Sequence, residues 1–135
     1  MPDLASVGAP CFQRASEAAA AAIRRTKASR GRIVAVGTTV VRALEHAGAR
    51  TGSVAAGEGV ATQRIHAYTW LRVVDTVLSG THEPHESHYQ LLRAFQDEAT
   101  LSRAGAALEA GGYRTHEFGD SVLVERRERR AAMAA

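Results

Sequence analysis

The chain has 135 residues, enough for one domain with a core, and it is 45% hydrophobic but only 5% aromatic. Seventeen Lys and Arg against fourteen Asp and Glu give a net charge of +3, which permits an anionic partner without requiring one. The single cysteine, Cys11, excludes an intramolecular disulfide, and no apolar run approaches the ~20 residues that span a bilayer. We therefore expect a cytoplasmic protein with a thin core and no membrane partner.

The positive charge is concentrated in two arginine-rich runs, "IRRTKASRGR" at 23–32 and "ERRERR" at 125–130. Neither run is interleaved with aromatic residues, as a nucleic-acid-binding face would be. Solvated helix faces therefore explain these runs more simply than a nucleic-acid surface does.

Three regions are predicted along the chain. Residues 1–13 combine turn-forming residues with no hydrophobic period, so we expect a disordered leader or the edge of something longer. Residues 14–126 are predicted to form a single α/β domain, and residues 127–135 a charged, disordered tail.

The first elements of the domain follow from capping residues and composition. Ser16 is predicted to cap an alanine-rich helix, "EAAAAAIRRTKAS", that stops at Gly31. "RIVAVG", at 32–37, is predicted to be a strand covered on both faces. Thr38 or Thr39 then caps a helix, "VVRALEHAG", that Gly48 ends.

The remaining elements complete an α/β pattern. We predict a loop over 50–59 and one or two strands within 60–80. Two helices follow, "ESHYQLLRAF" and "EATLSRAGAALEAGG", and a last strand lies around 122–124. Helices alternating with strands predict a layered α/β/α sandwich with a partly parallel sheet.

The "GTT" corner, Gly37 to Thr39, is the first candidate site. A helix that begins here leaves backbone N–H groups unpaired and directs a partial positive charge outward, so it can hold a carboxylate or phosphate. The motif is neither GxGxxG nor a P-loop, and simple capping by a threonine remains the alternative. Arg42 and Glu45, three residues apart, are expected to form a surface ion pair.

The segment "THEPHESHY" concentrates histidines and carboxylates, at His82, His85 and His88 with Glu83 and Glu86. Such groups can bind zinc or supply an acid and a base at neutral pH. HxxHxxH matches no zinc signature, however, and Pro84 separates the first histidine from a helix that carries the others. We therefore favour His82 as a single acid, base or donor, and expect no metal.

Two aspartates are further candidates. Asp120 stands in "FGDSVLV", just before a strand, where binding a substrate and bonding the local backbone are equally good interpretations. Asp75 lies within the apolar run "RVVDTVL", so its carboxylate must find a partner or line a cavity.

Four blocks, taken in order, resemble the S-adenosylmethionine:tRNA ribosyltransferase-isomerases of queuosine biosynthesis. "GRIVAVGTTVVRALE" is similar to R-x-[IV]-A-V-G-T-T-x-x-R-x-L-E, and "RVVDTVLSGTHEP" to V-V-D-x-L-x-T-N-F-H-L-P. "LLRAF" resembles the end of the following helix, and "YRTHEFGDSVLV" resembles Y-R-F-x-S-F-G-D-x-x-L-I. The resemblance covers about residues 16–124, only the C-terminal part of the family.

The resemblance implies a transferase that moves the ribosyl group of S-adenosylmethionine to a 7-aminomethyl-7-deazaguanine base in the tRNA anticodon and forms epoxyqueuosine. S-adenosylmethionine is then the ribosyl-donating substrate, and tRNA is the partner. His82 and Asp75 are the catalytic candidates in one pocket. The substrate-binding candidates are Gly37, Thr38, Thr39, Arg42, Phe118, Gly119 and Asp120.

The chain also departs from the family pattern. "SGTHEPHES" keeps His82 and Pro84 but has Gly80 and Thr81 at the Asn and Phe positions, and "HAYTW" stands where the family has a Y-P-G-Y-like segment. The fold is thus expected to be an incomplete version of the family's larger domain, with a separately encoded N-terminal portion as a further partner. An exposed sheet edge would favour oligomers or aggregates. The alternative is a non-catalytic, truncated paralogue that binds RNA or protein.

Overall fold

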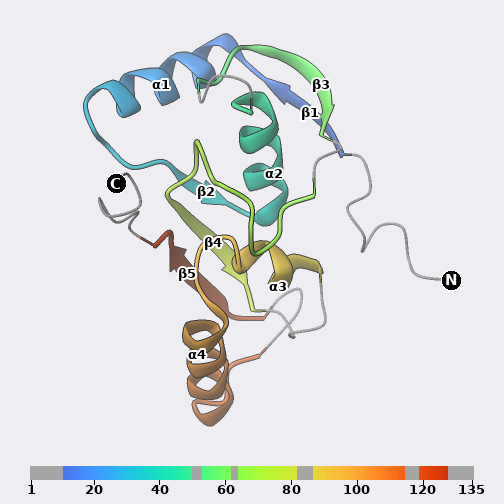
Figure 1. Cartoon of the computed structure of the whole chain (residues 1–135), viewed down its shortest axis with the longest axis vertical. Helices are drawn as coiled ribbons and strands as arrows, with labels where there is room; N and C mark the ends of the chain where they lie inside the picture. Colours follow the sequence, from blue (N-terminus) through green and yellow to red (C-terminus); the bar gives the residue numbers. More distant parts are fainter. Residues whose placement is uncertain (1–10, 50–52, 62–63, 82–86, 115–118, 128–135) are drawn as a thin grey trace, which may run out of the picture.

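The computed structural model describes residues 11–49, 53–61, 64–81, 87–114 and 119–127 (Figure 1). Their elements, in chain order, are β1 (Cys11–Ala15), α1 (Glu17–Ala28), β2 (Val34–Val36), α2 (Thr38–Ala47), β3 (Gly57–Ala61), β4 (Thr76–Gly80), α3 (Ser87–Leu92), α4 (Glu98–Ala110) and β5 (Ser121–Glu125). None of these helices is long and apolar enough to cross a membrane.

The main sheet has three strands in the order β2-β4-β5. β2 pairs with β4 in parallel, and β5 pairs with the other side of β4 in antiparallel orientation. The register places Ala35 opposite Val77, and Val77 opposite Val124. The mixed α/β class with a partly parallel sheet is therefore confirmed.

A separate two-stranded ribbon joins β1 to β3 in antiparallel orientation, with Cys11 opposite Ala61 and Ala15 opposite Gly57. Residues 11–13, expected in a leader, and residues 57–59, expected in a loop, therefore belong to strands. Helix α2 contacts the ribbon as well as β2 and β4, and lies between the ribbon and the main sheet (Figure 1). Because the two strands are remote in sequence and β3 is rich in glycine, no local pattern predicts this pairing.

The predicted ends of two helices are confirmed. The Ser16 hydroxyl accepts a hydrogen bond from the Ala19 N–H at 3.1 Å and caps α1. Gly111 follows the last residue of α4, where a C-terminal glycine was expected. Each end is fixed by residues within the same turn, which is why the sequence alone predicts it.

Helix α2 ends at Gly48 as predicted, but its start differs. Gly37 is the N-cap residue, with φ of 97° and ψ of 146°, and no side chain caps the helix. Thr38 and Thr39 are the first two helical residues, so the prediction that one of them caps α2 was wrong. A backbone with φ of 97° favours glycine, and it lets the helix begin one residue earlier than a threonine cap would allow.

The core is built mainly from aliphatic side chains. Val41 of α2 and Val77 of β4 are fully buried, and Val124 of β5 lies beside them in the same cluster. Phe95, after α3, is the largest fully buried side chain among the residues described. The core row of the sheet, Ala35, Val77 and Val124, thus packs together from all three strands.

The neighbouring cross-strand row lies on the opposite side of the sheet and is exposed. Val36, Leu78 and Leu123 are directly opposite one another, and 67%, 37% and 57% of their surfaces are accessible. The prediction that the strand at 32–37 is covered on both faces was therefore wrong. A strand made of β-branched residues is apolar on both faces, so its sequence does not show whether a second layer covers the sheet. Over this row, the second helical layer of an α/β/α sandwich is missing from the part of the chain described.

Candidate functional site

The strand directions bring three connections to one edge of the main sheet. β2 and the parallel β4 end at this edge, and the antiparallel β5 begins there. The Gly37 N–H donates to the Leu78 carbonyl at 2.9 Å, and the Thr81 N–H donates to the Asp120 carbonyl at 3.2 Å. Five predicted binding residues therefore gather at this carboxyl edge: Gly37, Thr38, Thr39, Gly119 and Asp120. Ligands of open α/β sheets bind outside the carboxyl ends of strands.

The corner at Gly37 has the geometry of an anion site. The first helical N–H groups of α2 have no side-chain cap, and the positive end of the helix dipole lies there. A Cβ built on Gly37 would meet nothing within 4 Å, so the corner borders open space. Thr38 is buried and Thr39 is exposed, so only the hydroxyl of Thr39 is readily available to a ligand. Arg42 is half-buried, one helical turn after Thr38.

Asp120 bonds the backbone of the connection that precedes β5. Its Oδ2 accepts the Arg114 N–H at 2.7 Å, and its own N–H donates to the Arg114 carbonyl at 3.0 Å. The Thr81 hydroxyl also donates to that carbonyl, at 2.7 Å. Asp120 therefore fixes the position of Thr81, the residue directly before His82, at the carboxyl edge.

The histidine segment is only partly covered by the structure. His82 and His85, like Phe118, lie outside the described residues. His88 is exposed on α3. Among the described residues, no group of three or more His, Cys, Asp or Glu side chains is placed to hold a metal ion.

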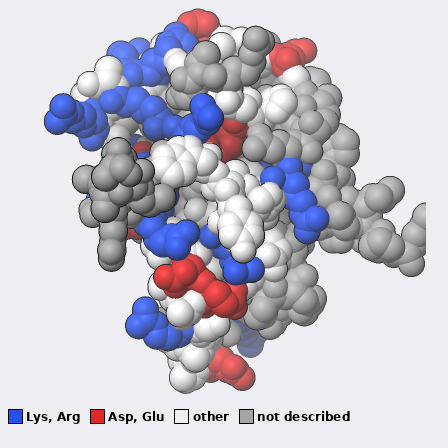
Figure 2. Space-filling view, in the orientation of Figure 1, with Lys and Arg blue, Asp and Glu red and all other residues white. Residues whose placement is uncertain are grey.

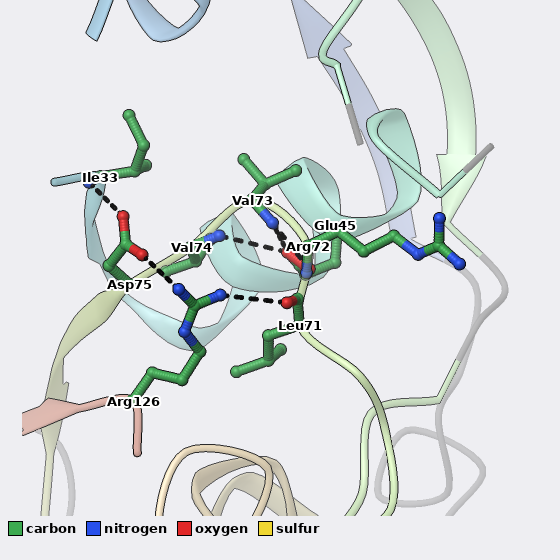
Figure 3. A network of polar contacts seen from close by, with 8 residues as sticks. All are labelled: Ile33, Glu45, Leu71, Arg72, Val73, Val74, Asp75 and Arg126. Atoms are coloured by element: carbon green, nitrogen blue, oxygen red, sulfur yellow. Dashed lines mark hydrogen bonds and ion pairs between the residues drawn. The ribbon is translucent and has the colours of Figure 1, made fainter. Parts of the chain in front are cut away.

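Asp75 lies at the opposite edge of the sheet (Figure 3). Its Oδ2 accepts the Ile33 N–H at 2.9 Å, and its Oδ1 pairs with Nη2 of Arg126 at 2.8 Å. Arg126 also donates to the Leu71 carbonyl at 3.1 Å. The length of β4, about 17 Å for five residues, separates Asp75 from Thr81. The structure therefore does not bring Asp75 into one pocket with the carboxyl edge, and gives its carboxylate a structural task.

Glu45 has a role that the sequence analysis missed. It is only 5% exposed, and its carboxylate accepts hydrogen bonds from the N–H groups of Arg72, Val73 and Val74 (Figure 3). The expectation that it forms a surface pair was wrong. Glu45 comes four residues after the fully buried Val41, on the same helical face, and that spacing is the signal that would have placed it inside.

The sheet and its edge define a mixed α/β protein with a candidate binding site at the start of α2. A family model described as "Queuosine biosynthesis protein" matches residues 12–124, so the chain belongs to this family. The resemblance seen in the sequence is thereby confirmed.

Several relatives carry the same name, S-adenosylmethionine:tRNA ribosyltransferase-isomerase. The chain is 40% identical to that of Citrifermentans bemidjiense over 111 residues, covering 82% of this chain and 32% of the relative. It is 39% identical to that of Gluconobacter oxydans, covering 79% of this chain and 31% of the relative. The chain therefore spans about a third of the length of these relatives.

A crystal structure of S-adenosylmethionine tRNA ribosyltransferase from Thermotoga maritima has a similar fold. The TM-score is 0.72 at 29% sequence identity, over 83% of this chain and 39% of the other. The fold assignment thus agrees with the family, and it too covers only part of the larger protein.

Proposed function

We propose that this chain supplies the carboxyl-edge part of the active site of an S-adenosylmethionine:tRNA ribosyltransferase-isomerase. The reaction moves the ribosyl group of S-adenosylmethionine to a 7-aminomethyl-7-deazaguanine base in the tRNA anticodon and forms epoxyqueuosine. The observation that carries this proposal is that the "GTT" motif, the end of β4, and Gly119 with Asp120, all remote in sequence, meet at one edge of the sheet.

The start of α2 suits an anionic group of either substrate. S-adenosylmethionine carries a carboxylate, and tRNA carries phosphates. Unpaired N–H groups and the helix dipole favour such a charge, and the Thr39 hydroxyl adds a donor. Arg42, on the same helix, contributes positive charge. His82 follows Thr81 directly and is the candidate to move a proton.

The rest of the family fold is a proposed partner. The exposed row of Val36, Leu78 and Leu123 borders the carboxyl edge, because Val36 directly precedes Gly37. An aliphatic row on a sheet face is normally covered by a second layer. We propose that the part of the fold that is present in the longer relatives covers this row and completes the site, either within one chain or as a separate polypeptide.

The second candidate function is a non-catalytic module that binds RNA or protein through the same fold. The exposed aliphatic row of Val36, Leu78 and Leu123 favours this alternative, because an apolar surface of this kind can bind another protein.

Calorimetry tests the proposal. S-adenosylmethionine is titrated into the chain alone and into the chain mixed with the remainder of the family fold, by which we mean the part of a longer relative that this chain does not match. The titration is then repeated with the Thr39→Val variant of the chain. We expect saturable binding that needs the remainder and weakens about tenfold in Thr39→Val, as for one lost hydrogen bond of about 1.4 kcal/mol.

Thr100→Val is the matched control, since Thr100 lies in the first turn of α4, away from the edge. It should bind like the wild type. Absence of any heat with a folded, assembled sample would contradict a role in binding S-adenosylmethionine.

A further inference from the structure

The segment between β3 and β4 exposes aromatic and basic side chains in alternation. In "RIHAYTWLR" the exposed residues are Arg64, His66, Tyr68, Trp70 and Arg72, whereas Ile65 and Leu71 are buried. The exposed fractions of Tyr68 and Trp70 are 92% and 52%. We call Arg64, His66, Tyr68, Trp70 and Arg72 the aromatic–basic strip.

A hydrogen-bonded turn presents the strip. The Thr69 N–H donates to the His66 carbonyl at 2.9 Å, and the His66 N–H donates to the Thr69 hydroxyl at 3.0 Å. The Tyr68 N–H donates to Nδ1 of His66 at 3.2 Å, and the two rings meet edge to face with centroids 6.2 Å apart. The backbone that carries Tyr68 is therefore ordered before any partner binds, which lowers the entropy cost of binding.

The strip is also anchored to the body of the protein. Its last residue, Arg72, donates its backbone N–H to the buried carboxylate of Glu45 on α2. The Arg72 side chain extends away from this network (Figure 3). Glu45 is seven residues, about 10 Å of helical rise, from Thr38 at the carboxyl edge. A chain of nucleotides bound at that edge can therefore reach the strip.

The composition of the strip fits nucleic acid better than protein. Aromatic rings stack on any unpaired base, and arginines neutralise phosphates and stack as well. Figure 2 shows Lys and Arg atoms around the uncharged middle of the face drawn, with Asp and Glu atoms above and below it, and the chain carries a net charge of +3. The row of Val36, Leu78 and Leu123 is by contrast aliphatic and uncharged, as expected for contact with protein.

We propose that the aromatic–basic strip is a stacking surface for single-stranded RNA. Tyr68 and Trp70 stack on unpaired bases, and Arg64 and Arg72 contact the flanking phosphates. The choice of RNA rather than DNA rests on the proposed function, whereas the stacking itself does not depend on ribosyl transfer or on S-adenosylmethionine.

Trp70 is the chain's only tryptophan, so its fluorescence reports directly on the strip. The protein is titrated with an unmodified single-stranded RNA of about ten nucleotides, without S-adenosylmethionine. We expect quenching of Trp70 by the single strand and little quenching by a duplex of the same length, because paired bases are not available for stacking. Anisotropy of labelled RNA measures the affinity in parallel.

Tyr68→Ala should weaken binding about tenfold, while Tyr68→Phe should retain the wild-type affinity, because phenylalanine also stacks. Tyr113→Ala is the matched control, since Tyr113 is 54% exposed after α4, outside the strip. Replacing Arg64 and Arg72 together by alanine should reduce the salt dependence of binding, and replacing the exposed Arg25 of α1 should not. Circular dichroism checks that each variant is folded.

Three results would overturn the proposal. One is RNA binding by anisotropy without a change in Trp70 fluorescence, and a second is equal affinity of Tyr68→Ala and Tyr113→Ala. The third is a Tyr68→Ala variant that binds RNA normally but no longer associates with the remainder of the family fold, which would make the strip a protein interface. If RNA still quenches Trp70 fluorescence but the chain assembled with the remainder of the family fold does not transfer ribosyl, the proposed function is contradicted and the stacking surface is not.

Discussion

The carboxylate of Glu45 accepts the backbone N–H of Val73 with both oxygens, at 2.8 Å to Oε2 and 3.2 Å to Oε1. The N–H groups on either side, of Arg72 and Val74, donate to the same carboxylate. Glu45 thus joins α2, which begins at the candidate site, to the segment that leads into β4 (Figure 3).

Glu45→Ala should lower the free energy of unfolding by about 3 kcal/mol, because it leaves buried N–H groups without an acceptor, each costing about 1–3 kcal/mol before relaxation. Urea denaturation measures this change. Glu109→Ala, at an exposed position of α4, is the control and should change stability by no more than about 0.5 kcal/mol. Equal stability of the two variants would show that the carboxylate is not needed to hold the segment.

Asp75 and Arg126 should be coupled in a double-mutant cycle. Their side chains are 20% and 25% exposed and form a charge-assisted bond, so replacing each and both by alanine should give a coupling energy of about 1–2 kcal/mol. A coupling energy near zero would contradict a stabilising ion pair between Asp75 and Arg126. A further variant, Asp75→Asn, should lower Tm, because the ion pair is lost. If Asp75 instead moved a proton in the reaction, this variant would lose ribosyl transfer while its Tm stayed unchanged.

Leu123→Glu should leave the fold intact but prevent contacts through the exposed sheet face. The chain alone is expected to self-associate at high concentration, because Val36, Leu78 and Leu123 form an apolar row. The charged variant should sediment as a monomer and should not bind the remainder of the family fold. Tyr113→Glu is the control. A wild-type chain that stays monomeric at all concentrations would contradict the predicted association.

The stabilisation of α4 by Asp97 should depend on pH. The Thr100 N–H donates to Oδ1 of Asp97 at 2.7 Å and holds the pKa of that carboxyl below its usual value. The contribution is therefore complete above the unfolded-state pKa of about 3.9 and is lost as the pH falls through the folded-state pKa. Asp97→Ala should lower Tm at neutral pH, and the difference from the wild type should shrink in acid. A difference that does not change with pH would refute this linkage.

The helices were predictable where neighbours in sequence fix them. Ser16 and Gly111 mark the ends of α1 and α4 through contacts within one turn. The ribbon of β1 and β3 depends on a pairing across the whole of α1, β2 and α2, so no local pattern predicts it. The predicted start of α2 was wrong because the sequence "GTT" is compatible with either a threonine or a glycine as the N-cap residue. Only the φ of Gly37 distinguishes the two.

The candidate site was predicted by its motifs but not by its geometry. The strand directions place Gly37 and Asp120 at one edge of the sheet and Asp75 at the opposite edge. This separation depends on how the strands pair, which local sequence patterns do not predict. The aromatic–basic strip was not predicted, because Arg64 and Arg72 are single arginines, whereas the positive charge is concentrated in the long arginine runs. Alternation of burial along Arg64 to Arg72 becomes apparent only once the turn at His66 is known.

Product formation tests the central claim most directly. The chain and the remainder of the family fold are incubated with S-adenosylmethionine and tRNA that carries 7-aminomethyl-7-deazaguanine. Released adenine is measured by chromatography, and the modified base by mass spectrometry. We predict adenine release and epoxyqueuosine only when both parts are present, reduced in Thr39→Val and unchanged in Thr100→Val. Product formed by the remainder without this chain, or no product from the folded assembly, would contradict the claim.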